Sequence, residues 1–328
     1  MPDSLPRPED KAIAPAPLNV VVILNKGAGK NAAAEGSLPL DESLAAAFSA
    51  QGIAAEIVAP EPAGLTAAAE AALARARRKE IDAVVAGGGD GTIRSVAAVL
   101  ADSGVPLGIL PLGTLNHFAK DIGIPVDVDK AIGVIAERQI RAVDLGEVNG
   151  ASFVNNSSIG IYPYMVLDRE RRQKLRGMGK WTAMVLAFFR VMRAFPRRRI
   201  AVRADGATES LRTPCLFVGN NEYGTHVFSL GKRECLDAGA LWLYVAHPKS
   251  PAAFLSLAVR IALGRIDAAR DLTVLKVRSA EIAAAASRLP VALDGEVEIL
   301  SSPLKYRIRP KALAVFAPLA SAPETAKP

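Results

Sequence analysis

A glycine-rich turn that carries an aspartate is the strongest chemical signal in the sequence, and it reads GGGDGT over residues 87–92. Consecutive glycines let backbone N–H groups close on phosphate oxygens, and the N-terminus of a following helix favours negative charge. The charge of Asp90 would repel a phosphate, but it suits Mg²⁺ carried by a nucleotide. A simple strand-to-helix turn is the alternative, which three conformationally costly glycines disfavour. We predict a nucleotide site that uses Gly87, Gly88, Gly89, Gly91 and Thr92.

Two other turns also follow apolar runs and are less specific. Residues 27–32 (GAGKNA) loosely fit the dinucleotide fingerprint, but no acidic residue ends the next predicted strand, because Glu56 falls inside it. The segment also fails as a P-loop, and an ordinary tight turn explains it equally well. The third turn, 111–116 (PLGTLN), offers Thr114 and Asn116 as short polar groups for ribose, phosphate or base. Its value lies in its place after the second turn, at the same edge of the predicted sheet.

Strands and helices alternate through the first part of the chain, so these turns fall at strand ends. Continuous β-branched runs such as LNVVVIL at 18–24 are typical of parallel strands buried on both faces. We predict an α/β nucleotide-binding domain with a mostly parallel sheet over residues 18–143. Its predicted strands are 18–24, 54–58, 81–86 and 105–110, with helices near 44–51 and 65–79.

After residue 143 the pattern changes to short alternating or β-branched runs, which predict a strand-rich second domain over residues 144–303. Residues 1–17 and 319–328 are predicted to be flexible tails. The predicted strands of the second domain are 152–155, 200–204, 215–218, 241–246, 272–277 and 291–293, with helices near 178–195 and 251–264.

The composition limits the partners and the compartment. The chain has 328 residues, enough for two domains, and its net charge of +7 favours anionic partners such as nucleotides or acidic lipid headgroups. Two cysteines in such a length suggest a reducing cytoplasm, and the N-terminus does not read as a signal peptide. The apolar run 181–189 is too short to span a bilayer. We expect a cytoplasmic protein that associates peripherally with membranes.

Six motifs in order resemble the diacylglycerol kinase catalytic family, which includes sphingosine kinases and bacterial lipid kinases. The resemblance extends over roughly residues 18 to 318. The matching segments are LNKGAG at 24–29, GGGDGT at 87–92, PLGTLNHFAKDIGIP at 111–125, FVNNSSIG at 153–160, FVGNNEYG at 217–224 and LDGE at 293–296.

The resemblance implies an N-terminal ATP-binding domain and a β-sandwich-like C-terminal domain that binds a lipid, with the active site between them. It also implies that a final strand, about 304–318, returns to the first domain. The implied cofactors are ATP and Mg²⁺. ATP would lie against all three turns, which adds Asn25, Gly27, Gly29, Gly113, Thr114 and Asn116 to the residues of the second turn.

The family's catalytic carboxylates correspond to Asp294 and Glu296. We predict Glu296 as the base, with Asp294 and Asp90 shaping the metal and phosphate environment, because phosphoryl transfer needs charge neutralisation and a carboxylate near the attacking hydroxyl. Taken alone, residues 294–296 (DGE) favour a hairpin turn instead.

The implied function is ATP-dependent phosphorylation of a lipid hydroxyl, diacylglycerol-like or sphingoid-like. A soluble-substrate kinase of the NAD kinase type is the nearest alternative, because such enzymes share the GGDG turn. A non-catalytic nucleotide-binding regulator is another. The sequence contains no recognised nucleic-acid module, so we expect no nucleic-acid partner, and it leaves a homodimer open.

Several residues depart from the family pattern. Lys26 and Ala28 replace the usual Pro and Ser, and His117 stands where many members have Asp. Residues 237–239 (DAG) replace an Asp-Asp-Gly that helps to hold a structural Mg²⁺, so the sequence does not support that metal.

A basic amphipathic segment, 169–199, carries apolar residues on one helical face and Arg190 on the other. We favour packing of the apolar face on the protein, with the arginines free to meet lipid headgroups. The cluster Arg197, Arg198 and Arg199 is predicted to contribute to binding of anionic vesicles. The apolar face consists of Trp181, Met184, Val185, Phe188, Val191, Met192 and Phe195.

Overall fold

The structure of the chain is a computed structural model, which describes residues 16–26, 39–176, 180–195, 198–204, 207–223, 233, 235–263 and 271–318. Its N-terminal part is built on four parallel strands in the order β2-β1-β3-β4. Almost every residue of β1, β3 and β4 is buried, as expected for strands covered on both faces. The strands are β1 (Leu18–Leu24), β2 (Ile53–Val58), β3 (Ala83–Gly88) and β4 (Leu107–Pro111).

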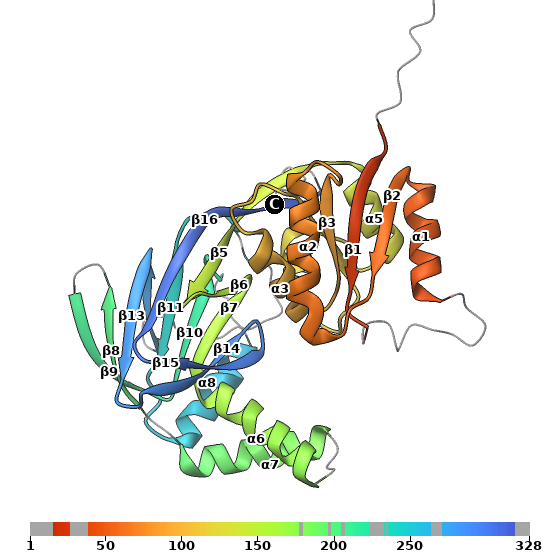
Figure 1. Cartoon of the computed structure of the whole chain (residues 1–328). Coiled ribbons are helices and arrows are strands. Elements are labelled where there is room, and N and C mark those ends of the chain that lie inside the picture. The colour runs from red at the N-terminus through yellow and green to blue at the C-terminus, as the bar shows by residue number, and fades with distance from the viewer. Residues whose placement is uncertain are drawn as a thin grey trace, which may run out of the picture.

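Helices pack on both faces of these strands, and the predicted α/β class is confirmed (Figure 1). The strand predicted at 81–86 runs instead from Ala83 to Gly88, because Gly87 and Gly88 still pair with β1 and β4. The elements that cover the sheet are α1 (Leu40–Ala50), the 3-10 turn η1 (Pro62–Gly64), α2 (Leu65–Arg77), α3 (Asp90–Leu100), α4 (His117–Ile122) and α5 (Val128–Ala136).

The C-terminal part is rich in antiparallel strands, as predicted. Six of them form one sheet in the order β12-β11-β10-β7-β14-β15, and alternate residues bury a second core against β8, β13 and β16. The strands of this sheet are β7 (Asn156–Gly160), β10 (Cys215–Asn220), β11 (Leu241–Ala246), β12 (Leu272–Val277), β14 (Arg288–Leu293) and β15 (Glu296–Ser301).

A long strand, β16 (Leu304–Phe316), connects the two parts (Figure 1). It pairs antiparallel with β13 and β5, and its end pairs parallel with β4 through Val315 and Leu107. One ten-stranded sheet therefore passes from the parallel part into the antiparallel part. The remaining strands of this sheet are β5 (Ile140–Val148), β6 (Ala151–Phe153), β8 (Arg198–Ala204), β9 (Ala207–Thr213) and β13 (Ser279–Ala284).

Three helices lie together at the lower end of the molecule in Figure 1: α6 (Ile161–Arg176), α7 (Lys180–Ala194) and α8 (Pro251–Ala262). Phe195, just after α7, contacts Phe254 of α8 with ring centroids 6.2 Å apart. Among the described residues, none of the helices has both the length and the apolar character to cross a bilayer.

Candidate active site

The parallel sheet brings the second and third predicted turns together with Asn25, which precedes the first, at the carboxyl ends of β1, β3 and β4. The N–H of Asn25 donates to the carbonyl of Gly87 at 3.0 Å, and the N–H of Leu112 donates to the carbonyl of Gly88 at 3.1 Å. We call residues 87–91 and 111–116, with Asn25, the glycine edge. Gly27 and Gly29, which were also predicted to bind ATP, lie outside the described residues.

The glycine edge needs glycine because two backbones approach closely. A Cβ on Gly113 would lie 2.5 Å from the Cα of Gly89, and backbone atoms cannot swing away as a flexible side chain could. Without side chains at Gly89 and Gly113, the two loops pack directly against each other beside the N-terminus of α3, which begins at Asp90. This arrangement is suited to an anion, since helix N-termini carry unpaired donors and positive potential.

Three of the predicted binding residues differ in what they offer to a ligand. Thr114 is exposed, whereas Thr92 is buried and its hydroxyl accepts from the Asn25 amide at 3.2 Å. Asn116 is buried in the left-handed region (φ 51°). Its amide donates to the carbonyls of Pro111 and Gly113 at 2.9 and 2.8 Å, so neither amide N–H remains for a ligand. Thr92 and Asn116 therefore both make hydrogen bonds that shape the glycine edge.

Within the glycine edge, Asp90 joins the second turn to the helix that follows the third turn. It is the first residue of α3, and its carboxylate accepts from the N–H groups of His117 and Phe118 at 3.2 and 3.1 Å. The amide of Asn155 lies 3.5 Å from the same carboxylate. Asp90 thus caps the short helix α4 and remains half-buried beside the glycine edge.

Asp294 occupies the turn of the β14–β15 hairpin and faces inward. It has φ 48° and Gly295 has φ 90°, the pattern of a tight hairpin turn that Asp-Gly favours. Its carboxylate accepts from the N–H groups of Val154, Asn155 and Asn156 at 2.7–3.0 Å. Burial raises the pKa of Asp294 to about 6, although those N–H groups act in the opposite direction.

Glu296 lies in a different environment from Asp294. Its side chain is 59% exposed and pairs with the guanidinium of Arg94 at 2.9 Å, and Glu298 pairs with the same arginine at 2.8 Å. It is close to the glycine edge, because a Cβ on Gly91 would lie 2.1 Å from a Glu296 oxygen. Of the two predicted C-terminal carboxylates, only Asp294 lines the large cavity.

The large cavity has a volume of about 540 Å³ and lies between the N- and C-terminal parts. One end is polar, with three carboxylates and two asparagines. The other end is apolar, with side chains from β10, β11, α8 and β12. Such a division suits an amphiphilic molecule. The polar lining includes Asp90, Asp121, Asp294, His117, Asn155, Asn156 and Ser158; the apolar lining includes Phe217, Ala246, Phe254, Leu257, Ala258 and Leu272.

A buried arginine that sequence reasoning missed connects the two parts behind this cavity. The Arg233 guanidinium is fully buried and pairs with Asp121 of α4 at 2.7 Å. It also donates to the carbonyls of Val154 and Asn220 and to the side-chain oxygen of Asn155. Asn155 in turn reaches Asp90. No local sequence signal points to Arg233, whereas Asn155 belongs to the matched segment 153–160.

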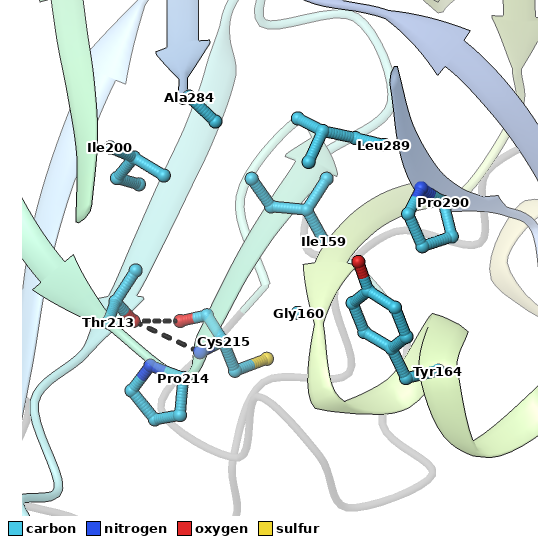
Figure 2. Close-up of a pocket in the computed structure, with 10 residues that line it drawn as sticks. All are labelled: Ile159, Gly160, Tyr164, Ile200, Thr213, Pro214, Cys215, Ala284, Leu289 and Pro290. Carbon is cyan, nitrogen blue, oxygen red and sulfur yellow. Dashed lines mark hydrogen bonds between the residues drawn. The ribbon is translucent and has the colours of Figure 1, made fainter. Parts of the chain in front are cut away.

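A second, much smaller cavity of about 10 Å³ lies between the two C-terminal sheets and is too small for a substrate (Figure 2). Cys215 lines both cavities. Its N–H donates to the Thr213 hydroxyl at 3.1 Å, and burial raises the pKa of its thiol to about 11. The thiol is therefore protonated at neutral pH and is a poor nucleophile.

Two of the cavity carboxylates, Asp90 and Asp294, suit a cation that arrives with a nucleotide. No group of three metal-ligating side chains occurs among the residues that the structure describes. Asp90 and Asp294 line one cavity, and Mg²⁺ typically uses one or two carboxylates, phosphate oxygens and water. In the DAG segment, Asp237 accepts from the Cys235 thiol at 2.9 Å.

The basic amphipathic segment forms α6 and α7. Met192 is buried, and Phe188 and Phe195 are half-buried around Ile161, as the packing interpretation predicts. Arg190 is 67% exposed and lies 3.6 Å from Asp168. Arg199 is exposed. The other residues named for this segment lie outside the described residues or side chains: Trp181, Met184, Val185, Val191, Arg197 and the Arg198 side chain.

Known proteins match both parts of the chain. Residues 19–148 match the diacylglycerol kinase catalytic domain, and residues 168–317 match the YegS C-terminal NAD kinase beta sandwich-like domain. A crystal structure of a Bacillus anthracis diacylglycerol kinase superimposes with a TM-score of 0.66 at 20% identity, over 93% of this chain and 98% of that chain. At this identity the superposition supports the fold alone.

Curated relatives cover shorter stretches. An uncharacterized Synechocystis protein is 27% identical over 72% of this chain and 55% of its own length. A Bacillus subtilis diacylglycerol kinase is 35% identical over 43% of this chain and 45% of its own length. A protein named "Probable lipid kinase YegS-like" from Pseudomonas syringae pv. tomato is 51% identical over 24% of this chain and 26% of its own length. The aligned regions thus span about half or less of these relatives. The matches agree with the motif order and the fold, and the chain belongs to the lipid kinase family that joins a diacylglycerol kinase catalytic domain to a YegS-type C-terminal domain.

Proposed function

We propose that this protein transfers the γ-phosphate of ATP to a hydroxyl of a lipid. The observation that carries the proposal is the large cavity, which has carboxylates at the end near the glycine edge and apolar side chains at the other. Membership of a kinase family supports ATP as the donor. The apolar end favours a lipid acceptor over a soluble one, because burial of each acyl CH₂ contributes about 0.8 kcal/mol.

ATP is proposed to lie with its phosphates on the glycine edge. The N-terminus of α3, which begins at Asp90, supplies unpaired donors and positive potential there. Mg²⁺, when bound with the nucleotide, would neutralise charge on the phosphates, and Asp90 is proposed to hold it. Asp90 also keeps α4 against the edge through its contacts with His117 and Phe118.

Asp294 is proposed as the base, in place of the sequence-based hypothesis for Glu296. As the oxygen–phosphorus bond forms, the acceptor hydroxyl loses its proton to the Asp294 carboxylate and ADP leaves with the bonding electrons of the broken bond. A pKa near 6 suits this role, since the carboxylate is ionised at neutral pH and still accepts a proton readily. Glu296 is held by Arg94 outside the cavity, where the pair can orient the glycine edge at Gly91.

The test is transfer of labelled γ-phosphate from ATP and Mg²⁺ into a bacterial lipid extract, separated by thin-layer chromatography. We expect a labelled lipid that disappears with Asp90→Asn. Label in NAD or another soluble acceptor, with none in lipid, would favour the NAD kinase alternative. ATP binding without transfer to either class of acceptor would favour the non-catalytic regulator.

Peripheral contact with an anionic membrane is a second proposal, supported by the net charge of +7 and by exposed Arg190, Arg193 and Arg199. Its direct test is cosedimentation with anionic and neutral vesicles. Equal binding to both, at low salt, would contradict an electrostatic contribution.

A further inference from the structure

The outer face of α8 is apolar although it is exposed. Leu255 and Val259 of α8 and Leu263, which directly follows the helix, recur every four residues, and their exposed fractions are 51%, 50% and 62%. The N–H of Leu263 donates to the carbonyl of Val259 at 3.0 Å and so continues the helical spacing. Residues at this spacing lie on the same face of a helix. The only charged residue of α8 is Arg260, which is half-buried and pairs with Asp271 at 2.8 Å. We call Leu255, Val259 and Leu263 the α8 stripe.

Helices at a water-facing surface ordinarily place charged and polar residues outward and apolar residues inward. α8 departs from this rule because both faces are apolar. Such a helix is normally buried, and an exposed apolar row marks a surface that meets another apolar phase. By comparison, the outer face of α7 carries the exposed cations Arg190 and Arg193.

The inner face of α8 is part of the large cavity. Phe254, Leu257 and Ala258 line its apolar end. The 12-residue helix α8 therefore lies between the apolar end of the large cavity and the exterior, and it presents apolar side chains to both. An acyl chain that moves past this helix would meet apolar groups throughout.

Charge indicates which apolar phase covers the stripe. Leu186 and Phe189 of α7 are 41% and 65% exposed, and Arg190 and Arg193 lie on the same helix. α7 and α8 meet through Phe195 and Phe254. Exposed apolar groups accompanied by cations fit the interface of an anionic bilayer, where apolar groups insert and arginines meet phosphates.

We propose that the α8 stripe inserts into the interface of an anionic lipid bilayer, so that an acceptor lipid passes from the membrane into the large cavity beside α8. The route of the acceptor rests on the lipid kinase function proposed above. Insertion of the α8 stripe does not rest on that function, because membrane insertion depends only on the exposed apolar side chains. A protein partner is the competing occupant. The exposed Arg190 and Arg193 of the adjoining α7 favour an anionic lipid surface over it.

The test is flotation of the full chain with vesicles of equimolar phosphatidylcholine and phosphatidylglycerol. The triple variant Leu255→Ser, Val259→Ser and Leu263→Ser is compared with the control Val126→Ser and Ile140→Ser, which removes apolar side chains of similar exposure, 52% and 55%, from the N-terminal part. We expect at least tenfold weaker vesicle binding by the triple variant and unchanged binding by the control. Arg190→Glu should weaken binding about fivefold, with a smaller effect on pure phosphatidylcholine vesicles.

Wild-type affinity in the folded triple variant would overturn the proposal, and so would a wild-type protein that binds neither vesicle. If the triple variant does not fold, as judged by circular dichroism, Leu263→Ser alone should still weaken binding about threefold. Flotation needs no turnover, so the two proposals fail separately. A protein that floats through the stripe but phosphorylates no lipid would refute the kinase function alone, and one that phosphorylates dispersed lipid without floating would refute the insertion alone.

Discussion

The glycine edge and the large cavity differ in what they are made of. The centre of the glycine edge is backbone, where Gly113 approaches Gly89. The large cavity consists of side chains from elements far apart in the sequence, from Asp90 of α3 to Leu272 of β12. The close approach of these two glycines leaves no room for an added side chain, whereas a cavity lined by side chains can change its shape by single substitutions. The first is suited to a donor common to many kinases and the second to a particular acceptor.

The largest expected effect separates the two candidate bases. Asp294→Asn should lower kcat by about 10²–10⁴-fold, the typical contribution of a general base, with ATP affinity nearly unchanged. Glu296→Gln should lower it less, because Glu296 acts through Arg94 and lies outside the cavity. Steady-state kinetics on the labelled lipid checks both variants. The reverse ranking would restore Glu296 as the base.

The connection between the two regions is tested by removing Arg233. Arg233→Met leaves Asp121 as an uncompensated buried charge, so we expect a loss of about 3–5 kcal/mol in the free energy of unfolding. The double variant Arg233→Met with Asp121→Asn should recover part of that loss. Denaturant unfolding measures both. A single variant as stable as the wild type would mean that the buried pair does not hold the parts together.

The pH dependence of turnover sharpens the assignment at the polar end of the large cavity. A base must be ionised to accept a proton, and the pKa of Asp294 is raised to about 6. The kcat should therefore fall as the pH drops below about 6, approaching tenfold per pH unit. ATP binding followed over the same range serves as the control. A rate that stays level to pH 4 would exclude Asp294 as the base.

The smallest effect concerns the backbone of the glycine edge. Gly113→Ala forces the two loops apart, which should cost about 1–3 kcal/mol of stability and weaken ATP binding. Gly133→Ala is the matched control, since nothing lies within 4 Å of an added Cβ in the middle of α5. That change should stabilise the helix by about 0.5–1 kcal/mol. Calorimetric titration with ATP and thermal unfolding measure the two variants. Equal ATP affinity and equal stability of the two would contradict the close approach of Gly113 to Gly89.

The glycine edge was largely predictable from sequence because its signals are local. Each turn follows an apolar strand, and parallel strands place such turns at one edge. Even there, Asn116 was assigned to a ligand although its amide closes its own loop. Side-chain hydrogen bonds to nearby backbone compete with ligand contacts, and the sequence alone does not rank them.

The large cavity was much less predictable. The DGE segment at 294–296 correctly suggested a hairpin turn, but the direction of its side chains depends on how β14 pairs with β7. That pairing delivers Asp294 to the N–H groups of residues 154–156. The Arg233–Asp121 pair joins residues 112 positions apart, and no periodicity links them. The fold class followed from local patterns, whereas the acceptor end required the tertiary arrangement.

The most direct test of the account compares the labelled lipid with its own water-soluble headgroup. Both carry the same hydroxyl, and only the lipid carries acyl chains. If the glycine edge and the large cavity form one active site, kcat/KM with ATP and Mg²⁺ should be at least 100-fold higher for the lipid. Asp294→Asn should lower the rate of both reactions by about 10²–10⁴-fold. Equal kcat/KM for the lipid and its headgroup would contradict binding of the acyl chains in the large cavity. Full activity of Asp294→Asn would contradict the assignment of Asp294 as the base.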